Sequence, residues 1–116
     1  MLGRRHLVAA TITAIAVAAA GCGQDASQSA SDRGERAFRA NCAACHGGDL
    51  AGTSLGPSLL GSDQEALTDA ELRLVIREGV ADTGGEFAGM PGNSVLRDAQ
   101  VNEIIAYVRT AQQTAP

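Results

Sequence analysis

Residues 42–46 read CAACH, so two cysteines three positions apart are followed directly by a histidine. At the end of a helix, Cys42 and Cys45 would lie about one turn apart, where both thiols can reach the vinyl groups of one porphyrin. His46 would then lie beneath the ring with an imidazole nitrogen on the iron. This motif is typical of c-type haem attachment, because a rigid porphyrin requires its two thioethers in fixed register. It predicts one covalently bound haem c with its iron.

Other chemistries use the same residue types. A C-x-x-C pair can be a redox dithiol, but such pairs usually accompany a βαβ pattern, which this sequence lacks. A structural zinc site needs four ligands, whereas the chain after residue 21 offers only one further cysteine, Cys22, and no second histidine. A plain disulfide between Cys42 and Cys45 leaves His46 unexplained. Haem attachment accounts for all three side chains of the motif.

A second iron ligand is suggested by Met90, the only methionine after Met1. Because His46 is the only histidine outside the first 21 residues, two histidines of the mature chain cannot ligate one iron. A thioether ligand raises the reduction potential relative to a second imidazole. Glycines around Met90 allow a close backbone approach, and Pro91 stiffens the loop. A lone methionine is more often a core filler, but beside CAACH we predict that Met90 is a ligand.

Three stretches have helical character, and no alternating strand pattern occurs. They cover residues 32–41, 69–78 and 98–110. Asp32 is in a position suited to an N-cap of the first. In the second and third stretches, apolar residues recur at helical spacing, at Leu72, Val75, Ile76, Val101, Ile104, Ile105 and Val108.

The second stretch has clear end signals. Thr68 and Glu71 have the spacing of a capping box, and Gly79 follows as a C-terminal stop. Gly-rich loops at 47–61 and 81–94 separate the three stretches. The pattern predicts a small all-α domain with two long loops.

These features resemble class I cytochromes c of the small bacterial monohaem kind, over residues 32–111. In that family the helix before the attachment motif carries a glycine and an aromatic residue, here Gly34 and Phe38, and the C-terminal helix carries an aromatic residue, here Tyr107. The resemblance implies an all-α cytochrome c fold, in which three main helices and long Gly-rich loops wrap around one covalent haem. Residues 112–116 would form a C-terminal tail.

The family also has a Gly-Pro-x-Leu segment, which matches residues 56–59. The resemblance implies that the Pro57 carbonyl accepts a hydrogen bond from His46 and fixes its tautomer, as expected around a metal-bound imidazole. Taken alone, Gly-Pro would be an ordinary turn. We predict no catalytic residues; the predicted haem-binding residues are Cys42, Cys45, His46, Met90 and Pro57, with His46 and Met90 on the iron.

Apolar side chains should line the remaining pocket, although each position also suits plain core packing. Arg73 and Arg77 could hold the haem propionates, but a solvated helix face is the more common role for such arginines. The pocket candidates by position are Leu55, Leu59, Leu72, Val75, Ile76, Phe87 and Leu96.

The N-terminal segment has the features of a secretory signal, namely Arg4 and Arg5, an apolar run at 7–20 and small residues at its end. The run is short for a membrane-spanning helix, which needs about 20 residues, although an uncleaved anchor is the alternative. The ending at 19–22, Ala-Ala-Gly-Cys, resembles the lipobox of bacterial lipoproteins. The resemblance implies that a signal peptide at 1–21 is removed and that Cys22 is lipidated.

Ala19 stands where a leucine is usual in the lipobox, so cleavage after an Ala-x-Ala at 18–20 remains an alternative. It would leave Cys22 as a free thiol in an oxidising compartment. Residues 22–31 are small and polar and predict a flexible tether. Because two or more acyl chains give stable anchoring, the exported domain would stay at the outer face of the cytoplasmic membrane or in the periplasm.

The 116-residue chain suffices for one small domain, and its aromatic content of 3% suggests that a haem fills the centre. Its formal net charge is −4. Without Arg4 and Arg5 it is near −6, because seven arginines and no lysine then remain against 13 acidic residues. This charge argues against nucleic-acid binding. It is compatible with a basic protein partner, or simply with a soluble acidic surface.

The sequence therefore predicts a single-electron carrier rather than an enzyme, since two axial ligands leave no place for a substrate on the iron. The expected partners are donor and acceptor proteins of an exported respiratory or similar chain. Two alternatives remain: a haem subunit of a larger oxidoreductase, and a peroxidase-like or gas-binding protein in which Met90 leaves the iron.

Overall fold

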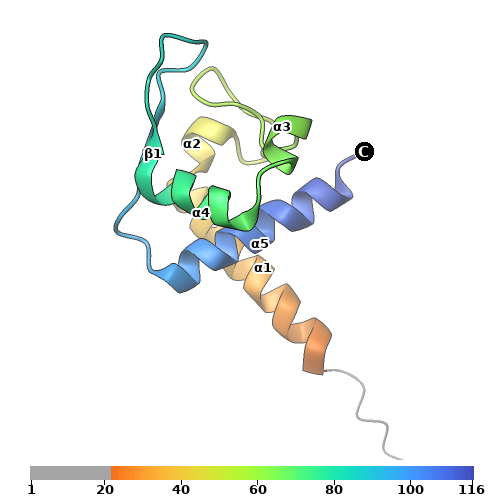
Figure 1. Cartoon of the computed structure of the whole chain (residues 1–116). Coiled ribbons are helices and arrows are strands. Elements are labelled where there is room, and N and C mark those ends of the chain that lie inside the picture. Colours follow the sequence, from red (N-terminus) through yellow and green to blue (C-terminus); the bar gives the residue numbers. More distant parts are fainter. Residues whose placement is uncertain (1–21) are drawn as a thin grey trace, which may run out of the picture.

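The computed structural model describes residues 22–116, with side chains from residue 29 onward. This part contains five helices and one short two-stranded antiparallel sheet, so the fold is mainly helical, as predicted. None of its helices is long and apolar enough to cross a membrane. The predicted signal peptide at 1–21 lies outside the described residues. In chain order the elements are α1 Cys22–Asn41, α2 Ala43–His46, α3 Ser62–Glu65, α4 Asp69–Glu78, β1 Gly79–Val80, β2 Met90–Pro91 and α5 Asp98–Thr114 (Figure 1).

The crossing of α1 and α5 is the centre of the fold (Figure 1). Gly34 permits it, because a Cβ atom at this position would overlap the backbone carbonyl of Glu103 and lie 2.9 Å from the Cβ of Tyr107. One turn later, Phe38 is 1% exposed, and its ring centroid lies 5.5 Å from that of Tyr107 at an angle of 54°. Tilted aromatic pairs add to the stabilisation that comes from burial alone. The residues that carried the resemblance therefore form the helix crossing.

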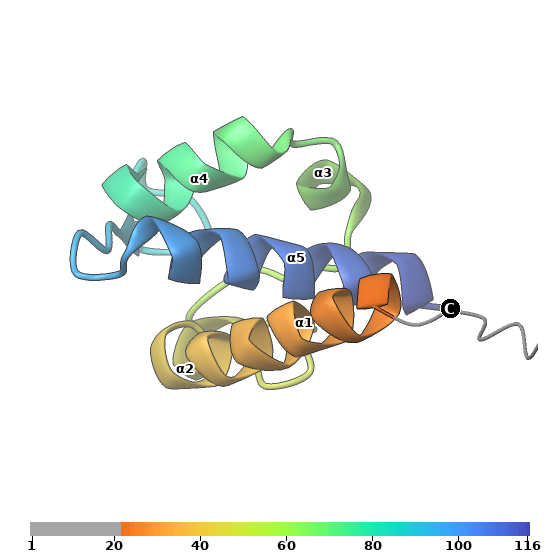
Figure 2. The ribbon, with the colours of Figure 1, turned by 90° about the horizontal axis from the view of Figure 1, so that it is seen from below.

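Helix α5 lies between α1 and α4 when the molecule is seen from below (Figure 2). Its apolar face has the helical spacing that the sequence predicts. Burying one such side chain stabilises the fold by about 1.5–3 kcal/mol. Together with Phe38, Leu50 and Leu96, the buried core comprises Val101, Ile104, Ile105 and Val108.

Helix α4 has the bounds that its end signals predict. The Thr68 hydroxyl accepts a hydrogen bond from the Glu71 backbone N–H at 3.2 Å, and the Glu71 carboxylate accepts one from the Thr68 backbone N–H at 2.7 Å. Gly79 ends the helix with a φ of 78°, a conformation that favours glycine. The predicted capping box and glycine stop are therefore both present.

The first helix begins earlier than predicted. Residues 22–31 are helical in α1, so the expected flexible backbone of this segment was wrong. Gly34 and Phe38 pack this helix against α5, and extending an existing helix costs little per residue. Residues 24–31 contain neither Gly nor Pro to stop it. Asp32 is consequently inside the helix and is not its N-cap.

The last helix and the loops also hold more regular structure than predicted. Helix α5 continues to Thr114, so most of the expected tail at 112–116 is helical. The four-residue α3 follows the first loop. Just before the second loop, β1 pairs with β2, which lies inside that loop, in the register Gly79↔Pro91 and Val80↔Met90. Strands of two residues leave no alternation in a sequence, which explains why they were missed.

Candidate functional site

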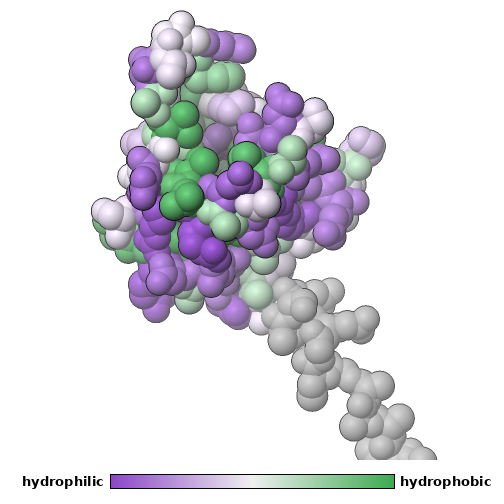
Figure 3. Space-filling model, viewed as in Figure 1, coloured by the Kyte–Doolittle hydropathy of each residue, from purple (hydrophilic) through white to green (hydrophobic). Residues whose placement is uncertain are grey.

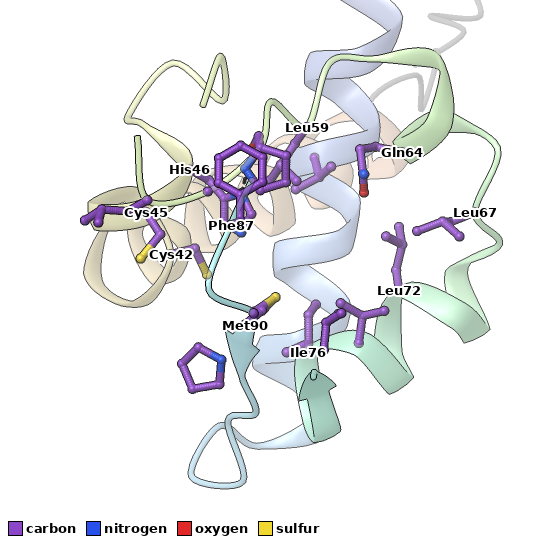
Figure 4. Close-up of a pocket in the computed structure, with 18 of the residues that line it drawn as sticks. Cys42, Cys45, His46, Leu59, Gln64, Leu67, Leu72, Ile76, Phe87 and Met90 are labelled. Atoms are coloured by element: carbon purple, nitrogen blue, oxygen red, sulfur yellow. Dashed lines mark hydrogen bonds between the residues drawn. The ribbon is translucent and has the colours of Figure 1, made fainter. Parts of the chain in front are cut away.

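A cavity of about 440 Å3 opens between α2, α4, α5 and the loops, within the size range of small-molecule sites. On the same face, hydrophobic surface gathers over α2, α4 and β1 and is bordered by polar residues (Figure 3). Figure 4 shows Cys42, Cys45, His46 and Met90 around the cavity. Pro57 lines it as well. The structure thus brings all five predicted haem-binding residues to one apolar cavity.

The two cysteines lie at the junction between α1 and α2. The Cys42 N–H donates to the Phe38 carbonyl at 2.8 Å, and the Cys42 carbonyl accepts from the N–H groups of Cys45 and His46 at 3.2 and 3.0 Å. The chain therefore keeps a helical turn through the motif. Both thiols are half-buried and free, and both line the cavity.

The environment of Cys42 differs from that of a redox dithiol. Burial raises the pKa of the Cys42 thiol to about 11, and the neighbouring Cys45 adds to the rise. Reactive C-x-x-C cysteines have lowered pKa values instead, because the thiolate is the nucleophile. The direction of the shift gives no support to the dithiol alternative.

The imidazole of His46 is 8% exposed. Its Nδ1 atom lies 2.9 Å from the carbonyl oxygen of Pro57, which is the contact that the resemblance implies. Since a carbonyl can only accept, Nδ1 must carry the proton and donate. When such a ring is neutral, its lone pair lies on Nε2, and an imidazole binds a metal through this lone pair.

The loop that carries Pro57 is tied to the CAACH turn. The Thr53 hydroxyl donates to the Cys45 carbonyl at 2.6 Å, and the Gly52 N–H donates to the His46 carbonyl at 2.8 Å. A Cβ atom on Gly56 would lie 3.0 Å from the Cys45 carbonyl oxygen. Small residues thus let the Pro57 loop approach the histidine closely.

Met90 is held at the cavity by the short sheet. It pairs with Val80, and a Cβ atom on Gly79 would overlap the Met90 carbonyl oxygen. Gly89, with a φ of 86°, turns the chain just before it. The half-buried Met90 side chain faces the cavity (Figure 4).

Arg77, on α4, supports residues 90–97, which we call the Met90 loop. Its guanidinium donates to the carbonyls of Leu96 and Asn93 and pairs with Asp98. Only 24% of its side chain is exposed. The expectation of a solvated face was wrong for this arginine, because open carbonyls of the loop are within its reach. Arg73 instead donates to the Asn102 side chain on α5.

The apolar lining agrees with the predicted set except at one position. Leu96 belongs to the buried core and does not line the cavity. Six of the seven predicted residues do, namely Leu55, Leu59, Leu72, Val75, Ile76 and Phe87.

Other lining residues were missed. Gln64 and Leu67 come from α3 and the segment after it, which have no periodicity that would reveal them. The periodic face of α5 did reveal Ile104, Ile105 and Val108, but as core; they border the cavity too.

The residues present fit a haem. Two thiols are available for the vinyl groups, an imidazole and a thioether are available for the iron, and the surrounding wall is mainly apolar. Among the described residues, no group of three or more His, Cys, Asp and Glu side chains is arranged to hold a metal ion. The described part therefore gives no support to the zinc alternative.

An α-helical fold around a C-x-x-C-H cavity defines a class I c-type cytochrome, whose cofactor is covalently bound haem c. Residues 29–108 match the family described as cytochrome C oxidase, cbb3-type, subunit III, and the chain belongs to this family. Its structure is similar to that of the c-type cytochrome XoxG from Methylobacterium extorquens AM1, with a TM-score of 0.60 and 22% identity. The match covers 72% of this chain and 50% of XoxG, and it shows the fold. None of the curated proteins matches the chain.

Proposed function

We propose that this protein carries single electrons on one haem c, attached at Cys42 and Cys45 and ligated by His46 and Met90. When bound, the haem supplies the redox centre. The chain holds it, orients its ligands and excludes water. The protein acts as an electron carrier, and not as an enzyme, between exported donor and acceptor proteins.

The observation that carries this proposal is the contact between His46 and Pro57. With Nδ1 donating to the Pro57 carbonyl at 2.9 Å, Nε2 is the ring nitrogen left to bind the iron. Burial of the ring restricts competition from water. A histidine in plain core packing needs no such fixed tautomer beside two cysteines that line the same cavity.

Met90 supports a carrier rather than a catalyst. It is the only methionine on the cavity wall, and the described lining contains no histidine besides His46. If His46 and Met90 both ligate the iron, they would leave no position on it for a substrate. A ligand set that stays unchanged on oxidation keeps the reorganisation small, which suits rapid electron exchange.

The partners and the location are also part of the proposal. The net charge near −6 of the chain after residue 21 suits partners with a basic docking surface. Lipidation of Cys22 would hold the protein at the outer face of the cytoplasmic membrane or in the periplasm. The side chain of Cys22 lies outside the described part, so the proposed lipidation rests on the lipobox-like residues 19–22.

Absorption spectra of the purified holoprotein test haem attachment. A low-spin c-type spectrum that remains with the polypeptide after denaturation and acid–organic extraction is expected. Cys42→Ala and Cys45→Ala should each lose a thioether, while Cys22→Ala should keep the haem and lose membrane association. A wild-type protein without covalent haem, from a host able to attach it, would refute the proposal.

Two substitutions at one position test the role of Met90. Met90→Leu preserves apolar volume but removes the sulfur, so the methionine–iron charge-transfer band should disappear. Met90→His offers another ligand and should restore a low-spin spectrum at a lower potential. A wild-type spectrum that is already high-spin at neutral pH would favour a reactive, open haem instead.

A further inference from the structure

The wall of the cavity opposite the cysteines must meet the polar end of the haem. In haem c the thioether positions and the two propionates lie on opposite sides of the porphyrin. Figure 4 shows Cys42 and Cys45 on one side of the cavity and Gln64 and Leu67 on the other. If the thioethers form at Cys42 and Cys45, as in the proposed function, the propionates would lie on the side of α3.

On that wall, the polar side chain of Gln64 has no hydrogen-bond partner among the described residues. It projects from α3 into the cavity (Figure 4) and is half-buried. Within residues 29–116 its side-chain amide makes no hydrogen bond, whereas its backbone N–H donates to the Gly61 carbonyl at 3.0 Å. Gln112, the other amide of the lining, is already engaged: it donates to the Leu59 carbonyl at 2.9 Å and accepts from Arg109 at 2.9 Å.

No arginine of the described part lines the cavity. Arg109, which binds the end of α3, is already engaged within the protein. It pairs with Asp69 at 2.9 Å and donates to the backbone carbonyls of Glu65 and Leu67. These two carbonyls flank the C-terminal end of α3, so Arg109 fixes the position of the short helix that carries Gln64.

We propose that the Gln64 amide donates a hydrogen bond to one haem propionate, and that Arg109 is a positioning residue that holds α3 for this contact. The inference rests on the proposed haem attachment. A carboxylate held by a neutral amide keeps a pKa closer to its ordinary range than one held by a guanidinium. Its protonation would then be coupled to the charge on the iron, and the reduction potential would fall as pH rises through this titration.

The test measures the reduction potential against pH in holoprotein variants. Gln64→Leu removes the donor, so the propionate pKa read from the curve should rise by about one unit, or tenfold in proton affinity. Gln64→Glu places a second carboxylate beside the propionate and should steepen the pH dependence further. Gln113→Leu is the matched control, because Gln113 is exposed on α5 and does not line the cavity.

A second readout does not depend on titration. In ¹H–¹⁵N NMR of the oxidised protein, the Gln64 side-chain N–H signals should show large hyperfine shifts and slow exchange, unlike those of Gln113. If Arg109 acts through Gln64, Arg109→Met as a single substitution should change the propionate pKa. The same substitution added to Gln64→Leu should change that pKa little further.

The outcomes separate the two claims. An unchanged pH curve in Gln64→Leu and Gln64→Glu, in protein with intact covalent haem, overturns the role of Gln64 and leaves the electron carrier untouched. Loss of covalent haem in wild type overturns the proposed function itself. Additive effects of Arg109→Met and Gln64→Leu on the propionate pKa would refute the positioning role.

Discussion

The Nδ1 atom of His46 donates to the carbonyl oxygen of Pro57 across 2.9 Å, and this bond joins the CAACH turn to the loop after it. Gly52 makes the loop geometry possible. Its φ is 85°, and a Cβ atom there would lie 2.6 Å from the Ser58 nitrogen and 2.9 Å from the Pro57 carbonyl carbon. Any side chain at this position must push the Pro57 carbonyl away from the histidine.

We therefore expect Gly52→Ala to weaken the His46–Pro57 bond and destabilise the holoprotein. Gly84→Ala is the matched control, since Gly84 has a φ of 74° but nothing within 4 Å of its would-be Cβ. The control should lose about 1–2 kcal/mol from the left-handed conformation alone, and Gly52→Ala should lose more. Guanidinium unfolding and exchange of the His46 ring N–H measure the two effects. Equal losses in both variants would show that the loop tolerates the clash.

The helix crossing gives a second prediction. Gly34→Ala places a methyl group against the backbone of Glu103, and the two helices must separate. Overpacking of this kind costs about 1–3 kcal/mol. Gly61→Ala, at a position with φ of −91° and no atom within 4 Å, should leave the free energy of unfolding nearly unchanged. Thermal unfolding of the two holoproteins checks this, and a neutral Gly34→Ala would contradict close packing at the crossing.

The sequence predicted those features whose signals act between residues close together in the chain. Helix α4 was predicted at both ends because Thr68, Glu71 and Gly79 act on neighbouring backbone groups. The cysteines and His46 were found for the same reason, since the haem requires them in fixed local register. The α1–α5 crossing came instead from a family resemblance carried by Gly34, Phe38 and Tyr107.

Features set by tertiary contacts escaped prediction. The carbonyls that Arg77 binds belong to the loop at 93–96, and nothing local to α4 indicates that this loop folds back onto it. Gln64 lies on α3, and the C-terminal end of α3 is bound by Arg109, 45 positions later in the chain than Gln64. The helical form of 22–31 depends on packing of the following turns, while its composition alone favours an irregular tether.

The capping box of α4 predicts a dependence of stability on pH. The backbone and side chain of Thr68 donate to the Glu71 carboxylate and lower the pKa of Glu71 below its ordinary value of 4.5. A carboxyl with a lowered folded pKa stabilises the protein above the unfolded pKa, and this contribution is lost as pH falls through the folded pKa. Stability should therefore decline below about pH 4.5 in part because Glu71 takes up a proton.

Thr68→Ala tests the capping box. The variant should lose about 1 kcal/mol at neutral pH, and the part of its acid destabilisation that comes from Glu71 should shrink. Thr110→Ala, on the exposed side of α5, is the control and should retain the wild-type pH profile. Urea unfolding between pH 7 and about pH 3 gives both quantities. An unchanged pH profile in Thr68→Ala would show that Glu71 is stabilised by something other than the cap.

The Met90 loop gives the last prediction, which assumes the proposed ligation. Arg77→Met removes the hydrogen bonds to the carbonyls of Leu96 and Asn93 while keeping an apolar stem, so the loop should open more often. Exogenous imidazole should then displace Met90 about tenfold faster, which corresponds to about 1.4 kcal/mol less resistance to opening. Arg73→Met is the matched control, because Arg73 lies on the same helix but donates its hydrogen bond to Asn102 on α5. Stopped-flow binding of imidazole to the oxidised proteins measures the rates, and equal rates in the two variants would mean that the sheet pairing of Met90 with Val80 holds the loop without help from Arg77.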